Sequence, residues 1–517
     1  MNTKLPRSIL PLVSTAGIVA AALLAGLAAS APAPALAQYL TVVGGPTFTP
    51  GVGGFAGGKV SSLDGLGAVG YVNKVDASRL LLGAFPFRWS MNASGTEIQW
   101  TELGILGNQD AVPGAYVNPG GYAHAMDGAG NVVGHVIDKY DGEHVRTRAV
   151  RWDAGGTAAT ELANLGTDPN GYTWGGASDV NAAGAIVGSA EKFDASGLSQ
   201  GWRALRWDAS GAMTELGTLD TNNSAGGAYN VATAINDAGT AIGLADKYDA
   251  AGVPKGQRAV RWDAGSTVPT ELANLGTDAN GFNETSAIAI NSAGVIVGTA
   301  WKFDANGLSR KVPVRWDVSG AVAELEILEL PAVHGSQQTE FAIDINNAGA
   351  AIGGFYLGGA VRWDASGAAT ELKSPLGERA ITEASDINNA GIVVGSSSFN
   401  NLMPRALYWG LDAVPVDLNS LIDPASGWTL TSAHSISDSG WFGGEGSFDP
   451  DGPGGQAAIN RLFLLHVPAA AVPEPAAGAL ALLGVSSILL LRRRSLWRPN
   501  KFEQALKKPA GEALTVK

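Results

Sequence analysis

Two loops in the sequence carry side chains of the kind that bind cations. Each places a carboxylate and an amide before a glycine, Asp168 with Asn170 in one loop and Asp278 with Asn280 in the other. Alternating oxygens of this kind open a calcium-binding loop, because Ca²⁺ prefers several oxygen ligands on a tightly turned backbone. The later ligands and the closing glutamate are missing, and Asx turns explain the same residues. The sequence therefore predicts turns, with calcium as the alternative and no other cofactor.

A repeated Lys-[Tyr/Phe]-Asp pattern supplies aromatic side chains, which are Tyr140, Phe193, Tyr248 and Phe303. Such rings, presented together on one face, would stack against sugars. Rings at strand ends also pack against their neighbours, which is the simpler interpretation. The candidate binding residues are these four together with Asp168, Asn170, Asp278 and Asn280.

Residues arranged for catalysis are not evident in the sequence. Neither a strand-turn-helix nucleophile elbow nor a His-Glu-x-x-His pair is recognised. There is no cysteine, and the six histidines are scattered along the chain. His124 and His434 occupy similar places in their repeats, so a histidine pair in a central channel is an alternative. The sequence predicts no catalytic residue and no metal site.

Most of the chain is a repeat of four strand-sized segments. In residues 177–216, an Asn-x-x-Gly turn joins two short apolar runs and an Asp-x-x-Gly turn joins two more. The glycine of the first turn recurs at Gly67, Gly130, Gly184, Gly239, Gly294, Gly349, Gly391 and Gly440. The third segment carries a tryptophan at Trp89, Trp152, Trp207, Trp262, Trp316, Trp363 and Trp409, with Phe463 in the eighth place.

These repeats predict an all-β fold. The 70 glycines and the charged fraction of 16% are typical of short, tightly turned strands rather than helices. Four strands in about 50 residues match a β-propeller blade. We expect a propeller over residues 38–470 with eight blades, seven being the alternative, closed by a strand at Tyr39–Val43. The tryptophans should lie in the core, and the long loops opposite the tight turns form the candidate binding face.

The pattern A-x-x-I-N-x-x-G-x-I-V-G, followed by Arg-Trp and a strand ending in Glu-Leu, resembles the HAF-type extracellular repeat family. The resemblance covers roughly residues 60–465, and its best matches are residues 287–298 and 385–395. It implies an extracellular bacterial protein and no particular activity.

Residues 1–37 are typical of a cleaved secretory signal peptide. Lys4 and Arg7 precede an apolar run over residues 18–29, and small residues end the segment at 35–37. An uncleaved anchor is the alternative, but the run is shorter than the ~20 residues of a membrane span. Removing the +2 of this segment, the −1 of Glu474 and the +6 of residues 492–517 from the net charge of −13 leaves −20 for residues 38–470. This charge argues against nucleic acid or anionic membrane as a partner.

The C-terminal end has three parts in order. Val472, Pro473, Glu474 and Pro475 precede an uncharged run over residues 476–491, which is followed by Arg492, Arg493 and Arg494. An apolar run stopped by arginines predicts a single membrane helix with its basic end in the cytoplasm. The three parts closely resemble the PEP-CTERM sorting signal, here residues 471–494. That resemblance implies processing by a membrane peptidase of the exosortase type, transient anchoring, and export to the cell surface. Residues 495–517 continue past the usual end of the signal as a basic cytoplasmic tail.

Two functions follow from these observations. The first is a non-enzymatic surface or matrix protein that binds exopolysaccharide or another surface protein. The second is a carbohydrate-active propeller enzyme, a lyase or a hydrolase. An active site breaks the symmetry of a repeat scaffold with unique polar residues, whereas the central copies here are alike. The sequence therefore favours the first function.

Overall fold

The computed structural model describes residues 43–44, 54–65, 67–76, 81–91, 98–106, 120–140, 145–219, 227–304, 307–328, 340–355, 358–400, 402–449, 451–452 and 458–467. Within these ranges the only helical segment is the short 3-10 helix η2 (Leu418–Leu421). All other regular structure is β-strand, so the all-β prediction is confirmed.

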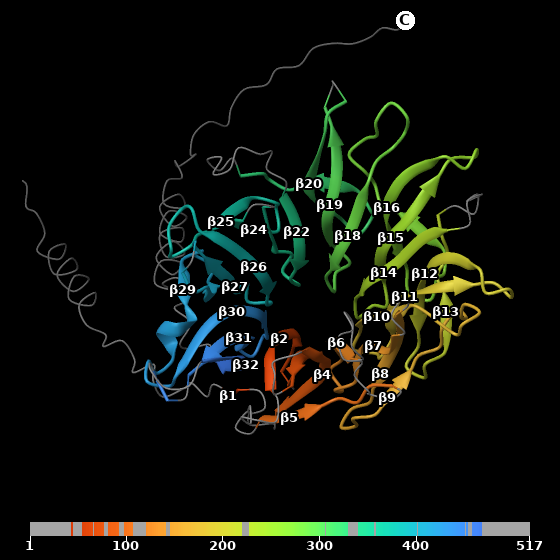
Figure 1. The fold of residues 1–517 in the computed structure, drawn as a ribbon. Helices are drawn as coiled ribbons and strands as arrows, with labels where there is room; N and C mark the ends of the chain where they lie inside the picture. Colours follow the sequence, from red (N-terminus) through yellow and green to blue (C-terminus); the bar gives the residue numbers. More distant parts are fainter. Residues whose placement is uncertain are drawn as a thin grey trace, which may run out of the picture. The chain divides into compact units, whose positions relative to one another are not determined.

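The described strands form six four-stranded sheets and one eight-stranded sheet (Figure 1). Five of the four-stranded sheets each contain consecutive strands: β2 (Gly54–Leu63), β3 (Gly67–Val75), β4 (Leu81–Met91) and β5 (Ile98–Glu102); β6 (Gly120–Met126), β7 (Val132–Tyr140), β8 (Val145–Trp152) and β9 (Ala159–Glu161); β18 (Thr285–Ile290), β19 (Ile296–Phe303), β20 (Ser309–Trp316) and β21 (Val322–Glu324); β22 (Glu340–Ile345), β23 (Ala351–Phe355), β24 (Ala360–Trp363) and β25 (Ala369–Leu372); β26 (Ile381–Ile387), β27 (Val393–Ser398), β28 (Arg405–Trp409) and β29 (Pro415–Asp417). The sixth pairs β1 (Val43–Gly44) with β32 (Ile459–His466), followed by β31 (Trp441–Phe448) and β30 (Trp428–Ile436).

The eight-stranded sheet is two repeats joined through the third strand of one and the first strand of the next. Its strands are β10 (Gly175–Val180), β11 (Ile186–Phe193), β12 (Ser199–Trp207), β13 (Met213–Glu215), β14 (Ala228–Ile235), β15 (Ala241–Tyr248), β16 (Pro254–Trp262) and β17 (Pro269–Glu271). Within each repeat the pairing is antiparallel, and the two repeats meet where β12 pairs in parallel with β14. Each set of four strands, here called a unit, matches the predicted four-segment repeat.

Two glycines in each central repeat fit specific backbone requirements. Gly294 ends the turn between β18 and β19 with φ of 83°, a region that glycine adopts without strain. Four residues later Gly298 faces the first strand of its unit so closely that an added Cβ would lie 1.9 Å from the Ser286 carbonyl oxygen. The motif therefore keeps glycine at both positions because one needs a left-handed turn and the other a close backbone approach.

The first strands of the units, here called the inner strands, contact one another in chain order. The contacts run from β2 through β6, β10, β14, β18, β22 and β26 to β30, which contacts β2 again. Apolar clusters also join neighbouring units, and one of them packs Trp441 and Leu464 against Val60 and Trp89. The units therefore follow one another in a closed circuit, which the strand labels trace in Figure 1 from β2 to β32.

In five units an Arg-Trp pair joins the unit to both of its neighbours. Trp262 is fully buried, and its Nε1 donates to the Gly217 carbonyl of the preceding unit at 3.1 Å. Arg261, one residue earlier, donates from Nη1 to the Val318 carbonyl of the following unit at 2.7 Å. All seven tryptophans of the repeat are fully buried, which confirms that they belong to the core.

The predicted closing strand is present where the structure describes it. Val43 pairs with Leu464 and Gly44 with Phe463, while residues 39–42 lie outside the described part. The place assigned to Phe463 is wrong. Phe442, two residues after the turn glycine, pairs with Leu465, just as Ile186 pairs with Trp207 in another unit. Leu465 therefore holds the tryptophan position, because the last unit places its third strand two residues further along.

Both predicted targeting segments, residues 1–37 and 471–494, lie outside the described residues, as does the tail 495–517. The described part of the chain contains no helix with the length and hydropathy needed to span a membrane. The predicted C-terminal membrane helix falls on residues 476–491 and stays a prediction.

Candidate functional site

The Asn-x-x-Gly turns after the inner strands are built by their own asparagine side chains. Asn181 accepts from the Ala183 amide at 3.1 Å and from the Ala185 amide at 2.9 Å through Oδ1. Because an amide side chain has both an acceptor and a donor, Nδ2 remains for a second partner. Each turn is thereby fixed by the oxygen of a side chain whose nitrogen points to the next unit.

The asparagine nitrogens link successive turns. Asn181 donates to the Asn236 carbonyl at 3.1 Å, although the two residues are 55 positions apart. The same bond is repeated from Asn236 to Asn291, Asn291 to Asn346, Asn346 to Asn388, and Asn388 to Ser437. These asparagines are buried, so each bond replaces contact with water that the side chain has lost. The sequence analysis recognised the turn and missed the bond between units, which no single repeat reveals.

A cavity of about 500 Å³ opens at this turn face. Seven residues from the ends of the inner strands line it, but their side chains belong to the apolar clusters between units: Leu63, Val180, Ile235, Ile290, Ile345, Ile387 and Ile436. Its rim is polar and comes from the turns, with Asp64, Asp237, Ser292, Asn347, Asn389, Asp438 and Ser439. The candidate binding face was predicted on the opposite, long-loop side, so the repetitive turns form a concavity that variability alone does not indicate.

The rim is acidic and keeps polar atoms for a ligand. Among the described residues that line the cavity there is no Lys, Arg or His, whereas there are three aspartates. Asp237 Oδ1 accepts from the Ala182 amide at 2.9 Å, and Asn347 Oδ1 from the Ser292 amide at 3.0 Å. The other side-chain atoms, Asp237 Oδ2 and Asn347 Nδ2, bond to no residue of the described ranges. The rim therefore presents an oriented acceptor and an oriented donor at the mouth of the cavity.

Three carboxyl groups lie on the inner strands just below the turns. Asp179 bridges units, since Oδ1 accepts from Val180 and Oδ2 accepts from the Ile235 amide, each at 2.9 Å. Burial raises the pKa of Asp179 to about 6. In equivalent places, the carboxyl groups of Asp344 and Asp386 are hydrogen-bonded to each other, and burial raises both pKa values. The charge of Asp344 raises the pKa of Asp386 further, so the pair holds a proton more readily than an isolated carboxylate.

The predicted histidine pair lies on inner strands that both contact β2. His124 on β6 places Nδ1 at 3.1 Å from the Ala177 carbonyl oxygen, and Nδ1 of His434 on β30 has no hydrogen-bond partner in the described ranges. Burial lowers the pKa of both imidazoles, that of His434 to about 4, and the Lys59 ammonium on β2 lowers both further. The structure thus brings Lys59, which the sequence analysis did not single out, to both histidines.

The predicted aromatic residues end the second strand of four units. Phe193, Tyr248 and Phe303 are half-buried, and Tyr140 ends β7 in the same position. The Phe193 ring lies 6.0 Å from the Trp174 ring of its own unit. The preceding lysines are engaged in ion pairs within their units, Lys192 with Glu215 and Lys302 with Glu324.

The loop residues Asp168, Asn170, Asp278 and Asn280 adopt Asx turns. Asp168 Oδ1 accepts from the Asn170 amide at 2.9 Å and from the Tyr172 amide at 2.7 Å. Asp278 Oδ1 accepts from the Asn280 and Phe282 amides, each at 2.8 Å. Across the described ranges, no group of three His, Asp or Glu side chains is placed to hold a metal ion.

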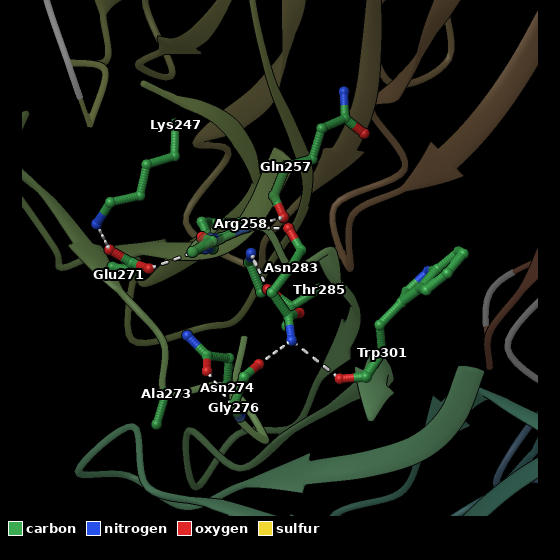
Figure 2. Close-up of polar contacts among 12 residues, drawn as sticks. Lys247, Gln257, Arg258, Glu271, Ala273, Asn274, Gly276, Asn283, Thr285 and Trp301 are labelled. Carbon is green, nitrogen blue, oxygen red and sulfur yellow. Dashed lines mark hydrogen bonds and ion pairs between the residues drawn. The ribbon is translucent and has the colours of Figure 1, made fainter. Parts of the chain in front are cut away.

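A buried arginine fixes the second of these loops to its unit (Figure 2). Arg258 is 2% exposed, donates from Nε to Glu271 at 3.1 Å, and donates from Nη1 to the Asn283 carbonyl. The Asn283 side chain in turn donates to the Gly276 carbonyl and to the Trp301 carbonyl, the latter at 3.0 Å. Figure 2 shows these groups pointing at one another. The network holds the loop in place, and Glu271 neutralises the charge of Arg258.

One Gly-x-Ser-x-Gly sequence occurs at residues 197–201 and lacks the context of a nucleophile elbow. Ser199 opens strand β12 and its hydroxyl donates to Glu191. A nucleophile elbow requires the serine between a strand and a helix, with a histidine as base. Here Ser199 lies between strand β11 and the rest of strand β12, so no helix follows the serine.

Comparisons with known proteins found similar folds at low identity. No family model matches the chain, and no curated protein matches it. The propeller domain of the Trilobed protease from Pyrococcus furiosus, described as having an open velcro topology, is 10% identical over 73% of this chain and 97% of its own, with a TM-score of 0.42. The structure of YCF48 bound to D1 peptide is 11% identical over 84% and 99%, with a TM-score of 0.34. An acylaminoacyl peptidase from Pyrococcus horikoshii is 12% identical over 76% of this chain, which spans 58% of that chain, with a TM-score of 0.38.

Proposed function

We propose that the chain is an extracellular eight-bladed propeller that binds a neutral glycan of the surface matrix in the cavity at its turn face. Each unit is one blade, and the blade count rests on the inner strands, which contact one another in order and return from β30 to β2. The signal peptide directs export, and an exosortase-type peptidase processes the C-terminal signal, so that the protein reaches the cell surface. Its partners are then exopolysaccharide or surface proteins, and membrane contact is limited to the C-terminal helix.

The observation that carries this proposal is the cavity itself. Its volume of about 500 Å³ lies in the range of pockets that hold small ligands. A sugar ring has hydroxyl groups at its edge and apolar C–H groups on its faces. The polar rim with Asp237 and Asn347 suits the hydroxyl groups.

Charge decides between neutral and acidic glycans at this cavity. Three rim aspartates and no cationic side chain make it repel an anionic sugar. Residues 38–470 add a formal charge of −20. A neutral polysaccharide, or a protein carrying neutral glycans, is therefore the favoured partner at this cavity.

The test is cosedimentation of the purified full-length chain with polysaccharide isolated from the producing cells and with neutral and acidic fractions of it. We expect binding to the neutral fraction that is insensitive to a chelator. The double variant Asp237→Ala and Asn347→Ala should weaken it at least tenfold.

The matched control changes the long-loop face. Tyr248→Ala with Asn280→Ala should leave binding intact, because these residues lie away from the cavity rim. If this control loses binding while the rim variant retains it, the site belongs on the long-loop face. Loss of binding with chelator would instead support the calcium alternative at Asp168 and Asp278.

One observation favours the carbohydrate-active enzyme as the second candidate. Asp344 and Asp386 form a hydrogen-bonded carboxyl pair with raised pKa values, and a carboxyl group that keeps its proton nearer to neutral pH can serve as a general acid. Here both groups also accept from inner-strand amides, Asp386 from Ile436 at 2.9 Å and Asp344 from Ile387 at 3.4 Å. Glycan fragments that accumulate with time, and that cease to do so in Asp386→Asn, would identify the enzyme.

A further inference from the structure

Three adjacent inner strands depart from the rest of the repeat. Where β6 and β30 carry His124 and His434, five other inner strands carry small or aliphatic residues, which are Ser178, Thr233, Ile288, Ile343 and Ser385. Between them β2 carries Lys59, at a position where other inner strands have Gly176, Val231 or Ser286. Polar residues that occur on only a few neighbouring copies of a repeat are not required by the packing that all copies share, so they indicate a candidate binding site.

Lys59 is a cation without a counter-ion in the described ranges. Its side chain is exposed and forms no ion pair there, while the lysines of the neighbouring Lys-[Tyr/Phe]-Asp motifs are paired with glutamates. The carboxyl group of Glu445, on β31 beside β2, accepts from the Gly58 amide, and burial raises its pKa. In a body of strongly negative charge, an unpaired ammonium between two imidazoles is available to an anion.

The two histidines differ in their hydrogen bonds. A carbonyl oxygen only accepts, so Nδ1 of His124 carries the proton that bonds to Ala177, and Nε2 is left without it. His434 has an unsatisfied Nδ1. This nitrogen is buried, and a buried ring nitrogen without a partner costs free energy.

Aromatic rings line the same region in a continuous chain. Tyr71, the strand partner of Lys59, lies 4.7 Å from the Tyr122 ring. Tyr122 stacks on His135 at 4.9 Å, and His135 meets His124 at 5.0 Å. The chain of rings thus runs from the strand pair that holds Lys59 to His124, so aromatic surface accompanies the positive charge.

We propose that Lys59 and His434 bind the carboxylate of a sugar acid, with Nε2 of His124 accepting from a sugar hydroxyl and Tyr71 and Tyr122 beside the sugar ring. The Lys59 ammonium pairs with the carboxylate, and His434 supplies a hydrogen bond from its ring. This site is distinct from the turn-face cavity. It lies close to it along the axis, because His434 precedes Ile436 of the cavity lining by two residues.

The test is titration of the purified full-length chain with glucuronate and with glucose as the neutral match, followed through the imidazole proton signals of the six histidines by NMR. His124→Gln and His434→Gln assign the two relevant signals. We expect glucuronate to shift both signals, and glucose to need at least a tenfold higher concentration for any shift. Acetate is a third arm: a shift with acetate shows that the carboxylate alone suffices, and its absence shows that the sugar ring is required. Both results support the site.

Lys59→Met is the deciding variant, since Lys59 is exposed and the change leaves an aliphatic stem of similar length. It should weaken glucuronate binding at least tenfold, while Lys255→Met, on a lysine paired with Asp249 at 3.0 Å, should leave it unchanged. Equal responses to glucose and glucuronate, or unchanged glucuronate binding in Lys59→Met with an unchanged thermal midpoint, would overturn the proposal. These outcomes do not involve the rim residues Asp237 and Asn347, so the two sites are tested separately.

Discussion

The side-chain nitrogen of Asn346 donates to the backbone carbonyl of Asn388 at 2.9 Å, joining two turns that are 42 residues apart. The oxygen of the same side chain accepts from the Ala350 amide at 2.8 Å and shapes its own turn. One residue type therefore serves both the local turn and the junction between blades. Its repetition in the sequence reflects both roles.

Removing one such asparagine should destabilise the ring. Asn291→Ala loses the bond to Asn346 and the acceptor for the Val295 amide, and we expect a cost of about 1–3 kcal/mol per buried group left unpaired. Urea unfolding of the full-length chain measures the change. Asn291→Asp is the matched control, because Asp127 already builds the same turn in another unit, accepting from Ala129 at 3.0 Å. Asn291→Asp keeps the acceptor for Val295 and loses only the donor to Asn346, so an unchanged stability in Asn291→Asp would show that the bond between units contributes nothing.

The tryptophan hydrogen bond can be separated from tryptophan packing. Trp262→Phe removes the bond to Gly217 and some buried surface, whereas Trp89→Phe removes similar surface from a ring whose Nε1 has no partner in the described ranges. We expect Trp262→Phe to cost about 1 kcal/mol more than Trp89→Phe, the worth of one hydrogen bond. Thermal and urea unfolding give the difference, and its absence would assign the whole effect to packing.

Asp179 should make the fold more stable in mild acid. Its pKa is raised from 3.8 to about 6 by burial, so the folded state takes up this proton before the unfolded state does. The contribution to stability therefore increases as pH falls from about 6 to about 4, and is lost as pH rises through about 6. The thermal midpoint of Asp179→Asn should gain less than that of the parent between pH 7 and pH 5.

A control of opposite sign accompanies this prediction. The hydrogen bond from the Ser210 hydroxyl lowers the pKa of Asp208, so its contribution is lost as pH falls. The thermal midpoint of Asp208→Asn should therefore fall less than that of the parent as the pH is lowered through the acid range. If both variants respond alike, the effect is one of net charge rather than of these particular environments.

Closure of the ring predicts a cost for removing the first strand. Deletion of Tyr39–Val43 takes away the strand partner of Leu464 and exposes an edge of β32. We expect a lower thermal midpoint, less cooperative unfolding and a greater tendency to aggregate, measured by calorimetry and light scattering. An unchanged midpoint would indicate an open array of repeats.

The C-terminal signal predicts location. Removal of Val472–Lys517 eliminates the apolar run and Arg492–Arg494, so the protein should be released into the medium. Fractionation of cells expressing the full-length and truncated chains measures this. Equal amounts of soluble extracellular protein from both forms would contradict the sorting function.

The sequence contained the repeat, the turns and the buried tryptophans, because each is a local pattern repeated at near-constant spacing. The place of Leu465 was missed, since a shift of two residues is visible only in the pairing with Phe442. Lys59 and His434 are far apart in the chain and meet only because the last unit returns to the first. The cavity was missed for a related reason: its lining takes one aliphatic residue from each contributing repeat, and none of them differs from an ordinary core residue.

The parallel pairing of β12 with β14 gives one junction between blades a different character from the others. There Gly201 is the register partner of Ala228 and Trp202 that of Tyr229, so backbone pairing continues from one blade into the next. Elsewhere in the described ranges, neighbouring blades are joined by side chains and isolated hydrogen bonds. Under a pulling force, or in slow hydrogen exchange, the junctions without backbone pairing should open first. Blades β10–β13 and β14–β17 should stay together longest.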